Sequence, residues 1–190
     1  MRVTADLGRC LVGMAVSLHV LGLAGAAAGE PIRAGTVALT LAGGYSLSHN
    51  ELAGNVDTLK GYHAIPHIGY FLAENFELLV EPTFLYLEGR EAARLGGLSL
   101  LARLVSGGSG MRVYVEAGGG GLEGRLQLRN GSCDAAFTVQ GGIGLLFFVS
   151  ERAAVSAGYR FHHLSNGNLC SGNPGLDSSM AVLGLSYFFP

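Results

Sequence analysis

Residues 152–164 read RAAVSAGYRFHHL, and polar and apolar side chains alternate along this stretch. Val155, Tyr159 and Phe161 fall on one parity, whereas Arg160 and His162 fall on the other. Successive side chains of a β-strand point to opposite faces, so this period of two predicts a strand with one apolar and one polar face. An arginine is costly against lipid and is accommodated inside a barrel. We therefore expect the apolar set to face lipid and Arg160 to face the lumen.

The same alternation recurs along most of the chain. We predict eight strands, over residues 35–47, 61–71, 75–87, 94–105, 111–122, 135–149, 152–164 and 177–189. Tight connections, at 73–74, 106–110 and 150–151, alternate with mostly longer and more polar ones, at 48–60, 88–93, 123–134 and 165–176. An even number of strands of this length predicts an all-β fold, an eight-stranded antiparallel up-and-down transmembrane barrel whose longer links are extracellular.

The composition favours a membrane barrel over a soluble domain. Of the 190 residues, 49% are hydrophobic and only 14% are charged, which would cover a soluble surface poorly. The net charge of -2 provides no basic patch for nucleic acid, so we expect no nucleic-acid partner. Gly118–Gly121 lack the Lys-Ser/Thr pair of a phosphate-binding loop, and we interpret them as small residues inside a closed barrel.

The amino terminus predicts export. Arg2 and Arg9 accompany an apolar run over residues 11–23, and Ala26–Ala28 supply small residues for cleavage. We interpret residues 1–28 as a signal peptide, which would remove Cys10, and residues 29–190 as the barrel. The apolar run is shorter than the roughly 20 residues of a spanning helix, and no later segment reaches that length. A mature protein in the membrane would therefore cross it with strands.

Three polar residues fall on the lipid-facing parity. His163 and Ser165 continue the outward set of their strand, and Asp177 shares the outward parity of the last strand. A serine, a histidine and a carboxylate are the groups that acyl transfer requires, whatever their order in the chain. Ser165 has no G-x-S-x-G elbow around it, which disfavours a soluble α/β-hydrolase. The alternative interpretation is that these are interfacial residues that bond to loop backbone at a strand end.

The longer motif favours a catalytic site. His163-Leu164-Ser165-Asn166 is followed by Asn173-Pro174-Gly175-Leu176-Asp177 and an aromatic final strand. This pattern resembles the PagL-type lipid A 3-O-deacylases, which are eight-stranded outer-membrane barrels. The resemblance implies His163 as the base, Ser165 as the nucleophile and Asp177 as the acidic member. It also implies an oxyanion site, which would comprise Asn173 and backbone amides near Asn166 and Gly167.

The resemblance further implies an activity and a location. The protein would hydrolyse the 3-position acyl ester of lipid A, a component of lipopolysaccharide, in the outer membrane of a Gram-negative bacterium. It would need no cofactor, and the histidines show no grouping for a metal. The family usually has glutamate where this chain has Asp177, and the shorter side chain raises the question of its reach to His163. A non-catalytic barrel for adhesion or envelope integrity and a phospholipase or esterase that uses the same residues are the alternatives.

Two further expectations concern pairing. Cys133 and Cys170 would lie in neighbouring extracellular loops, where an oxidising compartment permits a disulfide. Inside the barrel, Arg160 would join a polar network with Glu77, Glu81 or Glu116, and His162 would have a structural role because it has lumenal parity.

Overall fold

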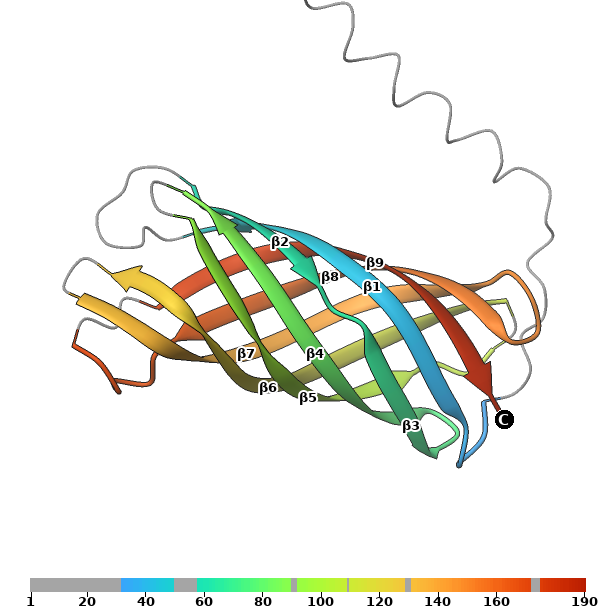
Figure 1. Ribbon diagram of the computed structural model, residues 1–190. Coiled ribbons are helices and arrows are strands. Elements are labelled where there is room, and N and C mark those ends of the chain that lie inside the picture. The colour runs from blue at the N-terminus through green and yellow to red at the C-terminus, as the bar shows by residue number, and fades with distance from the viewer. Residues whose placement is uncertain (1–31, 50–57, 90–91, 109, 129–130, 172–174) are drawn as a thin grey trace, which may run out of the picture.

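The computed structural model describes residues 32–49, 58–89, 92–108, 110–128, 131–171 and 175–190. The predicted signal peptide lies outside these residues. Nine strands are formed: β1 (Val37–Ser48), β2 (Lys60–Ala64), β3 (His67–Ala73), β4 (Phe76–Glu88), β5 (Ala93–Val105), β6 (Met111–Leu128), β7 (Gly131–Phe148), β8 (Ala153–Ser165) and β9 (Leu176–Phe189). Each strand pairs antiparallel with its neighbours, and β1 also pairs with β9, which closes the sheet into a barrel (Figure 1).

The barrel wall has eight strand positions, because β2 and β3 together occupy one of them. Both pair with β1 on one side and β4 on the other, and the register continues unchanged from one to the other. The prediction of a single strand over 61–71 is wrong in this detail. Pro66 separates the two pieces and lies opposite Pro82 of β4, and neither proline has an N–H for the ladder. The predicted eight-stranded fold is confirmed, with one interrupted strand.

The connections define two ends of the barrel. The turn end carries the short β3–β4, β5–β6 and β7–β8 connections together with the carboxyl terminus (Figure 1). The loop end carries the other connections, including a long hairpin formed by β6 and β7. The prediction of a loop over 123–134 is wrong, because strand pairing continues through Leu126 and Cys133 to the tip. Arg125 and Asp134 in this segment are exposed and form an ion pair of 3.7 Å across the hairpin.

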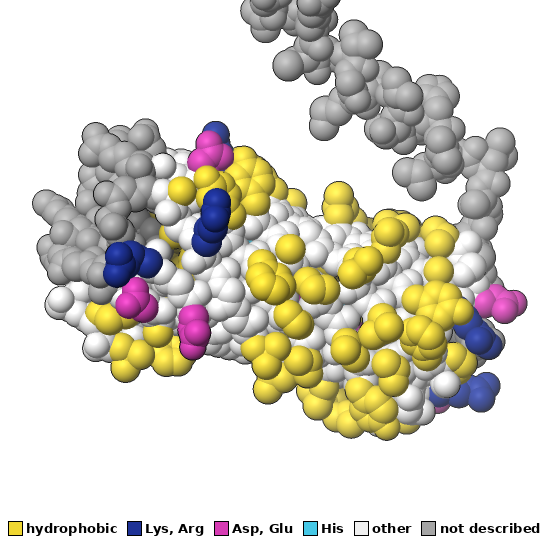
Figure 2. Space-filling view, viewed as in Figure 1, with side chains coloured by type: hydrophobic (Ala, Val, Ile, Leu, Met, Phe, Trp, Pro, Cys, Tyr) yellow, Lys and Arg dark blue, Asp and Glu magenta, His cyan; other side chains and the backbone are white. Residues whose placement is uncertain are grey.

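The outer surface is an apolar band. Large hydrophobic side chains alternate with buried ones along the strands, and on the face in Figure 2 charged side chains lie towards the two ends. Tyr45, Tyr62, Tyr86 and Tyr159 lie on a single rung of the ladder, with Ala181 between Tyr159 and Tyr45. The rung is inclined, because it passes from the middle of β8 at Tyr159 to near the loop end of β4 at Tyr86. We name these four residues the tyrosine belt. Tyr45, Tyr62 and Tyr86 lie near the loop end of their strands, where aromatic girdles mark the interface between hydrocarbon and headgroups in outer-membrane barrels.

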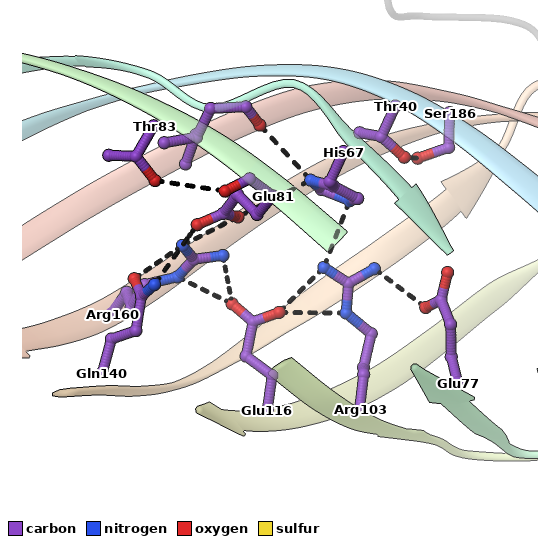
Figure 3. A network of polar contacts seen from close by, with 11 residues as sticks. Thr40, His67, Glu77, Glu81, Thr83, Arg103, Glu116, Gln140, Arg160 and Ser186 are labelled. Carbon is purple, nitrogen blue, oxygen red and sulfur yellow. Dashed lines mark hydrogen bonds and ion pairs between the residues drawn. The ribbon is translucent and has the colours of Figure 1, made fainter. Parts of the chain in front are cut away.

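The lumen is filled by a charged network (Figure 3). Arg160 donates to Glu81 at 2.8 Å and to Glu116 at 2.9 Å, while Arg103 donates to Glu116 at 2.8 Å. Glu77 binds Arg103 at 3.1 Å and is linked to Arg160 only through Arg103 and Glu116. His162 is buried beside these residues and its Nε2 lies 2.7 Å from Thr138 Oγ1. Arg160 and His162 therefore face the lumen. In the described ranges, no helix is long and apolar enough to cross a membrane.

Candidate active site

The end of β8 and the start of β9 bring a histidine and a carboxylate together on the outside of the barrel. His163 and Asp177 are direct partners in the β8–β9 ladder, and their side chains are both 38% exposed. His163 Nδ1 lies 2.6 Å from Asp177 Oδ1. A carboxylate only accepts, so the Nδ1–H donates, and the other ring nitrogen, Nε2, is the one left to act as a base. The aspartate reaches the imidazole although it is one methylene shorter than a glutamate.

Ser165 lies two residues beyond His163 on the same outward face, with Cα atoms about 6.6 Å apart. Among the described residues, no hydrogen bond joins its hydroxyl to His163. Gly175 lies one residue beyond the last ladder pair, Leu164 and Leu176, and so faces the rung of Ser165. A Cβ on Gly175 would be 3.1 Å from His163 Cε1 and 3.9 Å from Nε2. The free edge of the imidazole therefore lies towards the rung of Ser165.

The loop after Ser165 begins with a tight turn. The amide of Leu169 donates to the carbonyl of Asn166 at 3.0 Å, and the intervening Gly167 and Asn168 have φ values of 58° and 62°. The buried Asn166 side chain holds this turn, because Oδ1 accepts from the Asn168 amide at 2.9 Å and Nδ2 donates to the Cys170 carbonyl at 3.3 Å. The side chain of Asn166 thus shapes the loop, and Asn173 lies outside the described residues.

A disulfide anchors the same loop. Cys133 and Cys170 are bonded, with Cα atoms 5.9 Å apart. Cys133 lies on β7 and not in a loop, which corrects the expected placement. The bond therefore fastens the segment that follows Ser165 to the β6–β7 hairpin.

The sequence reasoning missed the apolar neighbours of these polar groups. Phe137 pairs with Ser165 and Val139 pairs with His163 across the β7–β8 ladder, and both side chains are exposed on the outer wall. The alternation of β7 would have given their outward direction, but only the register shows which residues they flank. Lipid-facing side chains therefore border the polar trio on the β7 side. In the ranges that the structure describes, no three potential ligands group as they would around a metal ion.

The sequence matches the family model for PagL, lipid A 3-O-deacylase, over residues 68–186. The chain belongs to this family. Membership implies lipid A 3-O-deacylase activity, which is hydrolysis of an ester, and location in the outer membrane of a Gram-negative bacterium. The expected family, activity and location are confirmed. In such barrels the short turns are periplasmic and the longer loops are extracellular, so we expect the loop end on the extracellular side of the membrane.

Solved structures agree with the fold. The crystal structure of the outer-membrane enzyme PagL has a TM-score of 0.56 and 18% identity, with 77% of this chain and 97% of that chain covered. Neisserial surface protein A gives a TM-score of 0.63 and 15% identity over 82% of this chain and 99% of its own. The N-terminal β-barrel domain of Pseudomonas aeruginosa OprF gives a TM-score of 0.51 and 21% identity, with 85% of this chain and 99% of that chain covered. At these identities the likeness shows the barrel fold alone. No single curated protein matches the sequence significantly.

Proposed function

We propose that this family member cleaves the 3-position acyl ester of lipid A in the outer leaflet with Ser165 as nucleophile, His163 as base and Asp177 as the carboxylate that orients the base. The observation that carries the proposal is the 2.6 Å contact between His163 Nδ1 and Asp177 Oδ1 on the lipid-facing wall. A soluble substrate would not require these groups to face lipid.

The reaction would proceed through an acyl-enzyme. The Ser165 hydroxyl attacks the ester carbonyl while His163 Nε2 takes its proton, and the imidazolium is stabilised by Asp177. The tetrahedral intermediate collapses when His163 returns the proton to the sugar oxygen, which leaves as the free 3-hydroxyl. Water then attacks the acyl-Ser165 ester, again with His163 as base, and releases the fatty acid. Alignment of Ser165 with Nε2 is expected to tighten when substrate binds, as in other hydrolases.

The negative charge on the intermediate requires donors near Ser165. The amide of Gly167, in the turn fixed by the Asn166 side chain, is a candidate donor, together with the amide of Asn166. Asn173 is a further candidate on the basis of the family motif, and its side chain amide could donate to the same oxygen.

The depth of the site supports a lipid substrate. His163 lies four residues beyond Tyr159 of the tyrosine belt, or about 13 Å along a tilted strand. His163 and Ser165 are among the last three residues of β8 and Asp177 is the second residue of β9, so the trio would lie at the end of the spanning strands, at the level of the headgroups. The ester linkages of lipid A, which join the sugar to its chains, lie at this level.

The test is the Ser165→Ala variant, refolded in detergent micelles with purified lipid A. We expect the release of 3-hydroxy fatty acid, measured by mass spectrometry, to fall to the uncatalysed level, because the hydroxyl that would form the acyl-enzyme is removed. Ser106→Ala, at the turn end, is the matched control and should keep wild-type activity. Unchanged release by Ser165→Ala would reject Ser165 as the nucleophile.

A further inference from the structure

A second polar cluster on the outer wall extends from Tyr159 of the tyrosine belt to the rung of the catalytic pair. His49 Nε2 lies 2.7 Å from Ser179 Oγ, and the Tyr159 hydroxyl lies 2.8 Å from the same oxygen. The three residues come from different places in the wall, since His49 follows β1, Tyr159 belongs to β8 and Ser179 belongs to β9. The proposed hydrolysis uses none of them.

This cluster is continuous with the site. Ser179 is two residues after Asp177 on the same face of β9, with Cα atoms about 6.6 Å apart. The His49 amide donates to the Asp177 carbonyl at 2.7 Å, which extends the β1–β9 ladder by one residue. Asp177 thus has His163 on one side and His49 on the other. Ser179 and Tyr159 lie on the bilayer side of the catalytic pair, because both lie nearer the middle of their strands, and His49 lies on the rung of Asp177.

The hydrogen bonds of the cluster leave one donor unused. If the Tyr159 hydroxyl donates to Ser179 and Ser179 donates to His49 Nε2, then the Nδ1–H of His49 remains. If the chain runs in the opposite direction, His49 Nε2–H donates to Ser179, Ser179 donates to Tyr159, and the phenolic O–H remains. Within the described part of the chain neither donor has a further partner. An unsatisfied donor at a lipid-facing position is costly, so a ligand that supplies an oxygen acceptor would be favoured.

We propose that His49, Ser179 and Tyr159 form a subsite that binds the carbonyl oxygen of an ester or amide linkage on an acyl chain of lipid A that is not cleaved. This inference rests on the proposed function, because it places the cleaved ester at Ser165. The rung of Ser165 is four residues from Ser179, or about 13 Å along the strand, too far for one ester group to occupy both places. A lipid with several acyl chains on a sugar can occupy both. The cluster therefore selects multiply acylated lipids over single-chain esters.

The first test compares two substrates. Ser179→Ala and Tyr159→Phe remove one hydroxyl each, and we expect the KM for lipid A to rise about three- to tenfold with kcat within twofold. Hydrolysis of a p-nitrophenyl ester of a single fatty acid should be unchanged. Ser179→Thr keeps the hydroxyl and should restore the wild-type KM. Tyr70→Phe is the matched control, because this exposed tyrosine lies on β3 towards the turn end.

Other outcomes would overturn the subsite. Equal losses on both substrates would indicate a disturbed catalytic pair, and an unchanged KM for lipid A would show that the hydroxyls do not touch substrate. A loss of kcat with KM unchanged would assign the cluster to the chemistry. Heat-modified mobility on gels, a signature of folded barrels, checks that each variant is folded before its kinetics are interpreted.

The second test separates this inference from the proposed function. Retention of radiolabelled lipid A by immobilised protein is compared between Ser165→Ala and the double variant Ser165→Ala/Ser179→Ala. We expect a three- to tenfold weaker apparent Kd for the double variant. If Ser165→Ala still hydrolyses lipid A, the proposed nucleophile is wrong, and the effect of Ser179→Ala on binding still decides whether the subsite exists. Equal binding by the two proteins would overturn the subsite whichever residue is the nucleophile.

Discussion

At the residue scale, the structure shows how the short side chain of Asp177 reaches His163 in the proposed site. His163 and Asp177 are direct ladder partners, so their backbones are already close, and a short side chain spans the remaining gap to 2.6 Å. The register of β8 against β9 thus compensates for the missing methylene. Both side chains are partly exposed, so solvent weakens the electrostatic attraction between them. The main effect of the pair in the proposed mechanism is to orient the imidazole.

The charge of Asp177 can be tested at constant shape. Asp177→Asn should lower kcat by about a hundredfold or more, because an amide neither fixes the required tautomer nor stabilises the imidazolium. Asp177→Glu should retain activity within about tenfold. Asp134→Asn, at an exposed aspartate of the same barrel end, is the control. Steady-state kinetics on lipid A decide the matter, and a wild-type kcat for Asp177→Asn would remove this residue from the mechanism.

Gly175 offers a second residue-scale prediction. Its φ of 65° is left-handed, and an added Cβ would approach His163 Cε1 to 3.1 Å, so the ring would have to move. We expect Gly175→Ala to reduce kcat about tenfold or more, because small displacements of a base are costly. The same change at Gly107, where a Cβ meets nothing within 4 Å, is the control. Both variants should also be unfolded in urea to measure their stability. An active Gly175→Ala protein would show that the imidazole ring tolerates the displacement.

At the element scale, the β6–β7 hairpin anchors the loop that follows Ser165 in the proposed site. Strand pairing in this hairpin continues to Leu128 and Gly131, and the Cys133–Cys170 disulfide joins the hairpin to the segment after Ser165. The Asn166 side chain orders the first turn of that segment from within. Loops carry functional residues on a scaffold of regular elements that positions them. Here the Cys133–Cys170 bond connects the loop after Ser165 to β7.

Loss of the disulfide should affect the loop and leave the barrel intact. Cys133→Ser and Cys170→Ser should each lower kcat by about tenfold through misplacement of groups near Ser165. Limited proteolysis should cut between residues 165 and 176 in both variants, while heat-modified gel mobility stays that of a folded barrel. The wild type with dithiothreitol should behave like the variants, and the variants should not respond to dithiothreitol. Full activity in the reduced protein would contradict the role.

At the scale of the whole molecule, the lumen is a polar core surrounded by an apolar exterior, the reverse of a soluble protein. Two arginines and three glutamates from β4, β5, β6 and β8 hold opposite walls together (Figure 3). Arg160 binds both Glu81 and Glu116 and is 1% exposed, and Glu116 joins it to Arg103. The rigid wall in turn keeps the rungs of β8 and β9 aligned at the site.

Removal of Arg160 should destabilise the barrel. Arg160→Met leaves Glu81 without its cation and should lower the free energy of unfolding by about 3–5 kcal/mol, measured by urea titration in micelles. Arg33→Met, at an exposed arginine, should cost less than about 1 kcal/mol. The double variant Arg160→Met/Glu81→Gln should be more stable than Arg160→Met alone, because the uncompensated carboxylate is gone. A double variant no more stable than the single would contradict this pairing.

The sequence by itself determined the barrel, its strand number and the outward parity of His163, Ser165 and Asp177, because a period of two fixes which face each side chain occupies. It did not reveal the interruption at Pro66, since the alternation continues on both sides of the proline. Nor did it reveal the extension of β6 and β7, since exposed polar residues in a strand resemble those of a loop. Only the tertiary structure decided the partners: the rung shared by His163 and Asp177, the bond from Cys133 to Cys170, and the cluster of His49, Ser179 and Tyr159. These depend on register between strands distant in the chain, which alternation within one strand leaves undetermined.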